Sequence, residues 1–121
     1  TSELLRRLDA DLICLQETTP PMERHLSTAL RHQYPHRRFF GHEGKFAAER
    51  FGVLSKQHIS EVEFYPPDAG LFGFVLLKTR LGGKDVQVAN VHLEPVRPGK
   101  GFLGALQAFP EAEKVHLLEF L

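Results

Sequence analysis

The sequence feature that most constrains this chain is the stretch Asp9–Thr18, which reads DADLICLQET. Its centre, Leu12–Leu15, is an unbroken apolar run, which is typical of a strand that is buried on both faces. The run ends in Gln16 and Glu17, two polar residues that a buried strand normally avoids. Because open α/β sheets bind ligands at the carboxyl ends of their central strands, Glu17 is a candidate site residue. An equally acceptable interpretation is that Glu17 leaves the strand into solvent or caps the next helix.

Length and charge define the broad class of protein. The chain has 121 residues and a hydrophobic content of 42%, which suits one domain, or part of one, with a real core. Its 15 basic residues balance its 15 acidic residues, which disfavours long nucleic acids and anionic membranes as partners. Cys14 is the only cysteine and lies inside the apolar run, so it is expected to be a small core residue. The sequence shows no membrane-spanning segment and no signal peptide.

Hydrophobic periodicity predicts two early helices, followed by a region rich in strands. The helices are expected at Ser2–Leu8 and from Pro20 to the Tyr34-Pro35 boundary, because the residue before a proline avoids helical geometry. Six strands are expected, at Asp9–Gln16, His36–Gly41, Glu49–Lys56, Ile59–Tyr65, Phe72–Arg80 and Lys84–Leu93. The connection Leu81-Gly82-Gly83 is typical of a β-hairpin that joins the last two strands.

The remainder of the chain combines a long loop with a final helix. Glu94–Phe109 is rich in proline and glycine, and a loop of this length is more often functional than purely structural. Arg97 and Lys100 make it a candidate for substrate selection, although charged loop side chains are usually just solvated. The pattern of Pro110–Leu121 predicts a helix.

A second strand also changes from apolar to polar side chains at its carboxyl end. The period of two residues places Val86, Val88, Asn90 and His92 on one face of the last predicted strand. That face changes from core residues to polar ones at Asn90, which makes His92 a second candidate site residue. The alternative is a buried or edge histidine with satisfied hydrogen bonds. The other histidines form no zinc-binding pattern, so a zinc site is not expected.

Three stretches together resemble a known family. In order, DADLICLQE, ERFGVLSK and VANVHLEP are similar to the first half of the endonuclease/exonuclease/phosphatase (deoxyribonuclease I-like) superfamily, which includes deoxyribonucleases, apurinic endonucleases, sphingomyelinases and deadenylases. The Leu-Gln-Glu strand ending is the most specific element, and Asn-Val-His-Leu is the second. QETTP and NVHLEP most resemble bacterial members, some of them envelope-tethered. The resemblance therefore leaves the cytoplasm and the outer face of a bacterial envelope as alternative locations.

The resemblance implies an α/β (α+β mixed) fold that is half of a four-layer α/β/β/α sandwich. Residues 1–121 are then a single partial domain, the N-terminal half of the family's domain, and the first strand and the C-terminal half would be missing. This half is expected to form one mixed, mostly antiparallel sheet with flanking helices. The open face of that sheet would be covered by the missing half or by a homo-oligomer.

The resemblance also implies roles for individual residues. Glu17 corresponds to the glutamate that binds the catalytic metal, which is Mg²⁺ with Mn²⁺ as the alternative. His92 corresponds to a histidine that contacts the scissile phosphate, and Glu49 to a glutamate that hydrogen-bonds this histidine. Glu49 is equally well explained as a solvated charge. Asn90 is expected to be structural, and Arg50 is expected to face solvent.

The function implied is that of a Mg-dependent hydrolase acting on phosphodiesters or phosphomonoesters, in small molecules, lipid phosphates or short nucleic acids. The sequence contains neither Gly-Asp-x-Asn nor Ser-Asp-His, the family motifs that carry further phosphate-side residues and the general base. The isolated chain is therefore expected to be inactive. The alternative is a non-catalytic interaction module that retains the fold. The presence of both motifs after Leu121 in the parent gene would distinguish the two.

Overall fold

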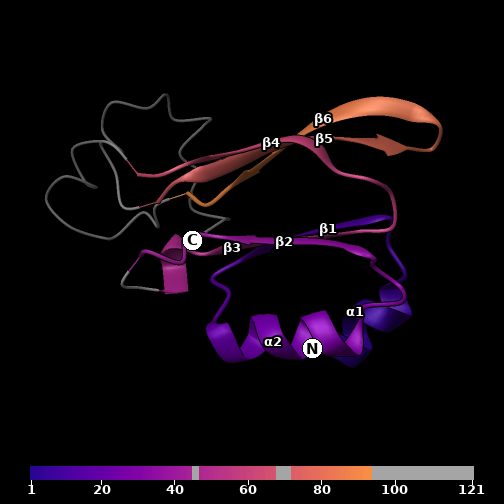
Figure 1. Ribbon diagram of the computed structural model, residues 1–121, viewed down its shortest axis with the longest axis horizontal. Coiled ribbons are helices and arrows are strands. Elements are labelled where there is room, and N and C mark those ends of the chain that lie inside the picture. The colour runs from indigo at the N-terminus through magenta and orange to yellow at the C-terminus, as the bar shows by residue number, and fades with distance from the viewer. Residues whose placement is uncertain (45–46, 68–71, 94–121) are drawn as a thin grey trace, which may run out of the picture.

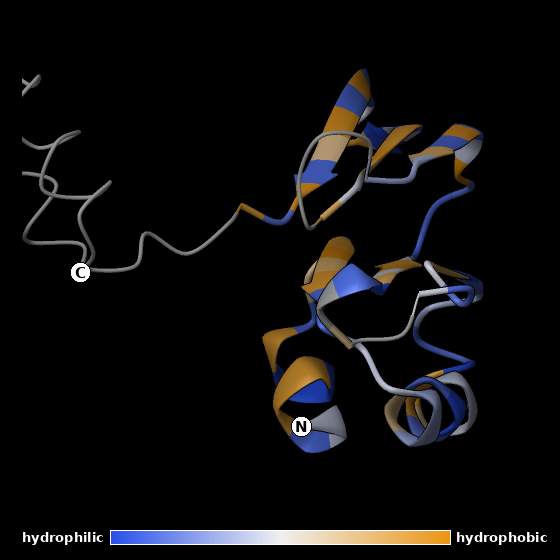
Figure 2. Ribbon diagram, turned by 90° about the vertical axis from the view of Figure 1, so that its left-hand side faces the viewer, coloured by the Kyte–Doolittle hydropathy of each residue, from blue (hydrophilic) through white to orange (hydrophobic). Residues whose placement is uncertain are grey.

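The computed structural model describes residues 1–44, 47–67 and 72–93, and these form three layers. Two helices cover one face of a three-stranded sheet, and a second three-stranded sheet packs on its opposite face (Figure 1). Figure 2 shows the same order of layers from the side, with helices below, the first sheet in the middle and the second sheet above. The predicted loop Glu94–Phe109 and the predicted helix Pro110–Leu121 lie outside the described residues.

Both helices predicted in the first part of the chain are confirmed. Helix α1 spans Ser2–Leu8 and ends at Asp9, whose left-handed backbone (φ 48°) lets its N–H donate to the carbonyl of Leu5. Helix α2 spans Pro20–Ala29, and the hydroxyl of Thr19 caps it by accepting from the N–H of Met22 at 3.4 Å. The helix therefore begins where its prolines predict, but it ends at Ala29, before the boundary expected at Tyr34-Pro35.

The sheet next to the helices, called sheet A, contains strands β1 (Leu12–Gln16), β2 (His36–Phe40) and β3 (Phe51–Ser55). Their order is β1-β3-β2, and both pairs are antiparallel. Strand β3 is central, and all of its residues are buried. A short 3₁₀ helix, η1 (Ala47–Glu49), leads into it.

The outer sheet, called sheet B, contains β4 (Ser60–Tyr65), β5 (Phe74–Leu81) and β6 (Lys84–Val91), in that order and antiparallel. The predicted hairpin is confirmed. Leu81 pairs with Lys84 across Gly82 and Gly83, which both have positive φ (55° and 76°). Positive φ at both central residues is the geometry of the two-residue turn that matches the twist of paired strands.

Two apolar cores hold the three layers together. The core between the helices and sheet A is centred on Leu5, Leu26, Leu30, Tyr34 and Leu54. The core between the sheets is centred on Val53, Ile59 and Leu77. Strand β3 contributes to both cores because its side chains alternate between faces, with Leu54 toward the helices and Val53 toward sheet B.

The predicted mixture of helices and antiparallel strands is confirmed, whereas the prediction of one sheet is corrected to two. Ile59–Tyr65, Phe72–Arg80 and Lys84–Leu93 have one apolar face each, and that face packs on sheet A instead of extending it. The face of sheet A that was expected to await another half or a second copy is therefore covered by this chain's own sheet B (Figure 2).

The position of β1 also differs from expectation. Within the described residues β1 pairs only with β3, so it is an edge strand of sheet A and β3 is the central one. Ile13 and Leu15 pack toward the helices, and Leu12 packs toward sheet B, but Cys14 is exposed. The apolar run thus marks a strand in the middle layer, and the expectation that Cys14 is a core residue is wrong.

Gly52 provides a test of how tightly sheet A is packed. A Cβ at this position would lie 2.8 Å from the ring of Phe39 and 3.4 Å from Leu15, its neighbours on the two flanking strands. We expect Gly52→Ala to lower the free energy of unfolding by about 1–3 kcal/mol, since overpacked cores cost this much. Urea denaturation measures it. In the Phe39→Leu background the same change should cost markedly less, and equal costs in the two backgrounds would contradict the assigned contact.

Candidate active site

The ends of β1 and β6 meet at one end of the sandwich, where polar groups join the two sheets. Asn90 is 3% exposed, and its side-chain amide donates to the carbonyl of Leu15 at 3.0 Å and to that of Gly52 at 3.5 Å. Gln16 donates to the carbonyl of Val91 at 2.6 Å and to the Asn90 side-chain oxygen at 3.3 Å. Asn90 therefore makes structural contacts, as the family resemblance implies, and with Gln16 it joins the two sheets beside the candidate residues.

Glu17 follows β1 in a left-handed backbone conformation, with φ 56°. Residues other than glycine rarely adopt this backbone conformation, which costs of the order of 1–3 kcal/mol. The Glu17 carboxylate is 61% exposed, and its Oε1 lies 3.3 Å from Nε2 of His92. The two strand ends that the sequence singled out therefore meet, although their residues are far apart in the chain.

His92 is held by aromatic rings. Its side chain is 14% exposed, and its ring stacks on Phe72 with centroids 4.2 Å apart and planes 15° apart. The ring of Phe51, in sheet A, makes a T-shaped contact with it, with centroids 6.5 Å apart and planes at 82°. Packing of this kind restricts the ring, so His92 presents Nε2 toward Glu17 in a defined orientation.

Glu49 ends the short helix η1 just before β3. Its carboxylate lies directly against Gly44, where any side chain would collide with it. It also lines a cavity of about 420 Å³, whose apolar walls include Phe39, Phe40 and Phe64. The predicted hydrogen bond from His92 to Glu49 stays a prediction.

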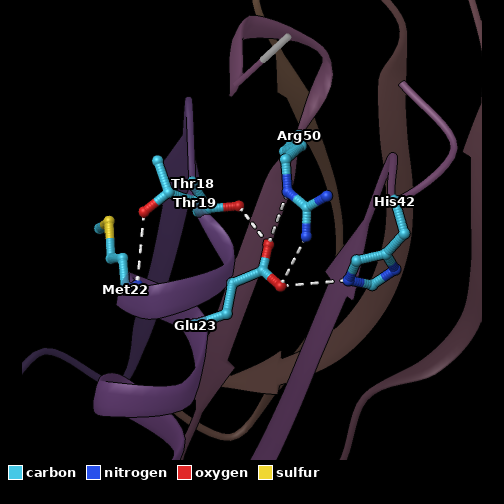
Figure 3. Close-up of polar contacts among 6 residues, drawn as sticks. All are labelled: Thr18, Thr19, Met22, Glu23, His42 and Arg50. Carbon is cyan, nitrogen blue, oxygen red and sulfur yellow. Dashed lines mark hydrogen bonds and ion pairs between the residues drawn. The ribbon is translucent and has the colours of Figure 1, made fainter. Parts of the chain in front are cut away.

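A buried cluster of polar side chains lies beside this site (Figure 3). It was not predicted from the sequence. Glu23, on the first turn of α2, accepts from Arg50 through both oxygens, at 3.2 Å and 3.0 Å. Thr18 donates to Oε1 at 2.7 Å, and His42 contacts Oε2 at 3.1 Å. The expectation that Arg50 faces solvent is wrong: Arg50 and Glu23 are each 8% exposed.

One signal in the sequence would have revealed this pair. Glu23 lies three residues before Leu26 and seven before Leu30, so helical periodicity places it on the buried stripe of α2. Arg50 directly precedes a strand of uniformly buried residues. A buried charge requires a partner, so a glutamate and an arginine at two such positions are candidates to pair.

The pKa of Glu23 follows from these contacts. Burial alone would raise the pKa of its carboxyl, but the hydrogen bonds from Arg50, Thr18 and His42 favour the charged form and outweigh that effect. The net result is a pKa below the ordinary value of 4.5. Glu23 is therefore a buried carboxylate that stays ionised at neutral pH.

The residues present are compatible with part of a magnesium site. Across residues 1–44, 47–67 and 72–93, no three His, Cys, Asp or Glu side chains are grouped closely enough to hold a metal ion. Magnesium, however, is commonly held by one or two carboxylates together with waters and substrate phosphate. Glu17 is an exposed carboxylate at a strand end, which is what such a site needs from the protein.

Comparison with known protein families identifies the family of this chain. The family model described as the endonuclease/exonuclease/phosphatase family matches residues 1–115. The chain belongs to this family, whose members are generally nucleases and phosphoesterases that hydrolyse phosphate esters. A comparison with curated proteins gives no match. In the part of the chain that the structure describes, neither helix has the length and apolar character needed to cross a bilayer.

Asn90 provides a test of the connection between the sheets. Asn90→Ala removes a donor to the Leu15 carbonyl inside the protein, and we expect it to lower the free energy of unfolding by about 1–3 kcal/mol. Gln87→Ala, at an exposed position of the same strand, is the control and should change it by less than about 0.5 kcal/mol. Chemical denaturation measures both, and similar costs for the two would contradict a structural role of Asn90.

The ionisation of Glu23 predicts a pH dependence of stability. Because its pKa is lowered in the folded state, its contribution is fully present above the ordinary carboxyl range and is lost as the pH falls through the folded-state pKa. We expect the difference in unfolding free energy between the wild type and Glu23→Gln to shrink as the pH falls through the ordinary value of 4.5 toward the lower folded-state pKa. Arg50 and His42 are the charged or titratable groups facing this carboxylate, so the comparison is repeated in a His42→Gln background. A difference that does not vary with pH would contradict the assignment.

Proposed function

We propose that the complete protein is a magnesium-dependent phosphoesterase. In this proposal Glu17 binds the metal, with Mn²⁺ as the alternative ion. His92 contacts the scissile phosphate, and Glu49 orients the His92 ring. The observation that carries the proposal is the left-handed conformation of Glu17 at the end of β1, which directs its carboxylate to within 3.3 Å of His92. Family membership supports the reaction class, and the contact between Glu17 and His92 supports the choice of these residues.

The conformation of Glu17 supports a functional role because it is costly. Backbone strain of this kind persists where the surrounding structure over-determines it, and it is concentrated at functional sites. Glu17 is also exposed, so it makes no packing gain that would explain the strain. The Glu17 carboxylate follows a strand of sheet A, and the His92 ring follows a strand of sheet B. Their close approach is consistent with both side chains binding the same ligand.

The roles proposed for the metal, His92 and Glu49 follow from the chemistry of phosphate ester hydrolysis. A bound Mg²⁺ would polarise a phosphoryl oxygen and stabilise the leaving oxygen. His92 supplies a ring N–H that can donate to a phosphoryl oxygen, from a ring that Phe72 already holds in place. Glu49 would hold the ring in one orientation, as carboxylates do for other histidines in active sites. In this scheme the Nε2 atom that faces Glu17 is the donor to the phosphate.

The substrate class follows from charge and shape. Equal numbers of basic and acidic residues provide no overall attraction to a long polyanion. The 420 Å³ cavity beside Glu49 has aromatic walls that suit an apolar or planar group next to the phosphate. We therefore propose a small phosphate ester, a lipid phosphate or a short nucleic acid as substrate. Similarity to bacterial envelope-type members stays a prediction from QETTP and NVHLEP.

The chain by itself is proposed to be inactive. It contributes the carboxylate for the metal and the histidine for the phosphate, but its sequence holds neither Gly-Asp-x-Asn nor Ser-Asp-His. Activation of the attacking water would come from residues outside these 121.

Glu17→Gln tests the metal role in the complete protein. Removing the charge of a direct ligand should weaken Mg²⁺ binding by more than about tenfold, the lower end of what changes to outer-shell partners cost. Hydrolysis of a chromogenic phosphodiester and of a chromogenic phosphomonoester should fall in parallel. Isothermal titration with Mg²⁺ measures the binding, and steady-state assays measure the turnover.

Glu61→Gln is the matched control. Glu61 also has a positive φ, 47°, and its side chain is 67% exposed, but it pairs with Lys78 near the opposite end of sheet B. It should leave Mg²⁺ binding and turnover unchanged. Wild-type affinity in Glu17→Gln would rule out the metal role. A protein that binds Mg²⁺ through Glu17 but hydrolyses neither ester would instead favour the non-catalytic interaction module.

A further inference from the structure

We propose that Glu23 is a positioning residue that holds Glu17 in place from the opposite side of sheet A. This inference rests on the proposed function for its consequence, but its structural part concerns the conformation of Glu17 alone. It is argued from the buried cluster of Glu23, Arg50, Thr18 and His42, to which nothing in the proposed function assigns a role (Figure 3).

The carboxylate of Glu23 is fully occupied. Its Oε1 accepts from Thr18 at 2.7 Å and from Nε of Arg50 at 3.2 Å. Its Oε2 is 3.0 Å from Nη2 of Arg50 and 3.1 Å from Nε2 of His42. Two partners on each oxygen leave little capacity for a metal or a substrate. The cluster is therefore a support for other groups and not a second binding site.

Two of the three partners of Glu23 are sequence neighbours of candidate active-site residues. Thr18 directly follows Glu17, and Arg50 directly follows Glu49. Glu23 lies in the helix layer, whereas Glu17 reaches toward His92 on the sheet B side. One buried carboxylate thus holds the residues next to both glutamates.

The link to Glu17 is short and rigid. Thr18 is 0% exposed, and its hydroxyl bond to Glu23 sets the position of the peptide that follows Glu17. Thr19 then caps α2, so the residue after Thr18 is also held. A chain anchored at this point must turn within Glu17, and the observed φ of 56° is that turn. Breaking the Thr18 bond should let Glu17 relax toward ordinary backbone geometry.

Stability alone is a poor reason to retain such a pair. Burying two charges costs desolvation energy, and replacing a buried ion pair by apolar residues of similar volume is often neutral or stabilising. What an ion pair with two parallel hydrogen bonds adds is a defined geometry. That geometry matters here because the neighbouring carboxylate must be directed at one point.

Thr18→Val tests the link with little risk to folding. The direct change, Glu23→Ala, leaves Arg50 buried without its partner and endangers the fold. Valine keeps the size of threonine and replaces its hydroxyl by a methyl group, while Glu23 keeps its bonds to Arg50. Thr18→Ser keeps the hydroxyl and is the conservative rescue. Thr79→Val is the matched control. Thr79, in sheet B, is also buried (6% exposed), and its hydroxyl donates to the carbonyl of His58. This contact lies at the end of the sheet opposite the candidate site.

Two measurements on the complete protein separate positioning from general destabilisation. A residue with φ near 56° has its amide and α protons close together, which gives a strong intraresidue NMR cross-peak. We expect Thr18→Val to lose this cross-peak at Glu17 and to weaken Mg²⁺ binding by about tenfold. Thr18→Ser and Thr79→Val should retain both properties of the wild type.

The outcomes distinguish the inference from the proposed function. An unchanged Glu17 cross-peak in Thr18→Val overturns the positioning role, and so does an equal loss in Thr79→Val. If Thr18→Val loses the cross-peak while the wild type binds no Mg²⁺, positioning of Glu17 is supported and the metal role falls. If the cross-peak and Mg²⁺ binding are lost together in Thr18→Val alone, both stand.

Discussion

The structure depends on the burial of β3 on both of its faces. Leu54 packs against the helices and Val53 packs against sheet B, so this short strand contributes to both apolar cores. Its neighbours must leave room for that packing, and Gly52 admits the ring of Phe39 because it has no side chain. This one strand therefore determines the positions of the layers on both of its faces. It also fixes the positions of the residues that directly flank it.

That fixed position explains the character of the candidate site. Around the ends of β1, β3 and β6, apolar packing gives way to polar contacts that are nearly all satisfied within the protein. Asn90 and Gln16 join the two sheets, and the Glu23–Arg50 pair joins the helix layer to sheet A. Glu17 and His92 lie between these supports, one exposed and strained and the other packed against aromatic rings. A site built this way is preorganised by its surroundings and not by its own contacts.

Sequence reasoning succeeded where a signal is local. Prolines marked the start of α2, two glycines marked the hairpin between β5 and β6, and period-two alternation separated the buried Asn90 from the exposed Val91. It predicted burial wrongly where burial depends on which other segments of the chain pack against a residue. Cys14 reads as a core residue but is exposed, and Arg50 reads as a surface charge but is buried. Both depend on which segments lie alongside, and hydrophobic pattern does not specify that.

The sequence by itself determined the class of the fold, the two strand ends that carry Glu17 and His92, and the family to which they point. These follow from local patterns of apolar and polar residues, which act over a few positions. Only the tertiary structure decided that the strands divide into two sheets, that β3 is central and that Glu23 supports the residues beside Glu17. Strand partners and buried charge pairs join residues distant in the chain, so they are selected by the free energy of packing the whole domain.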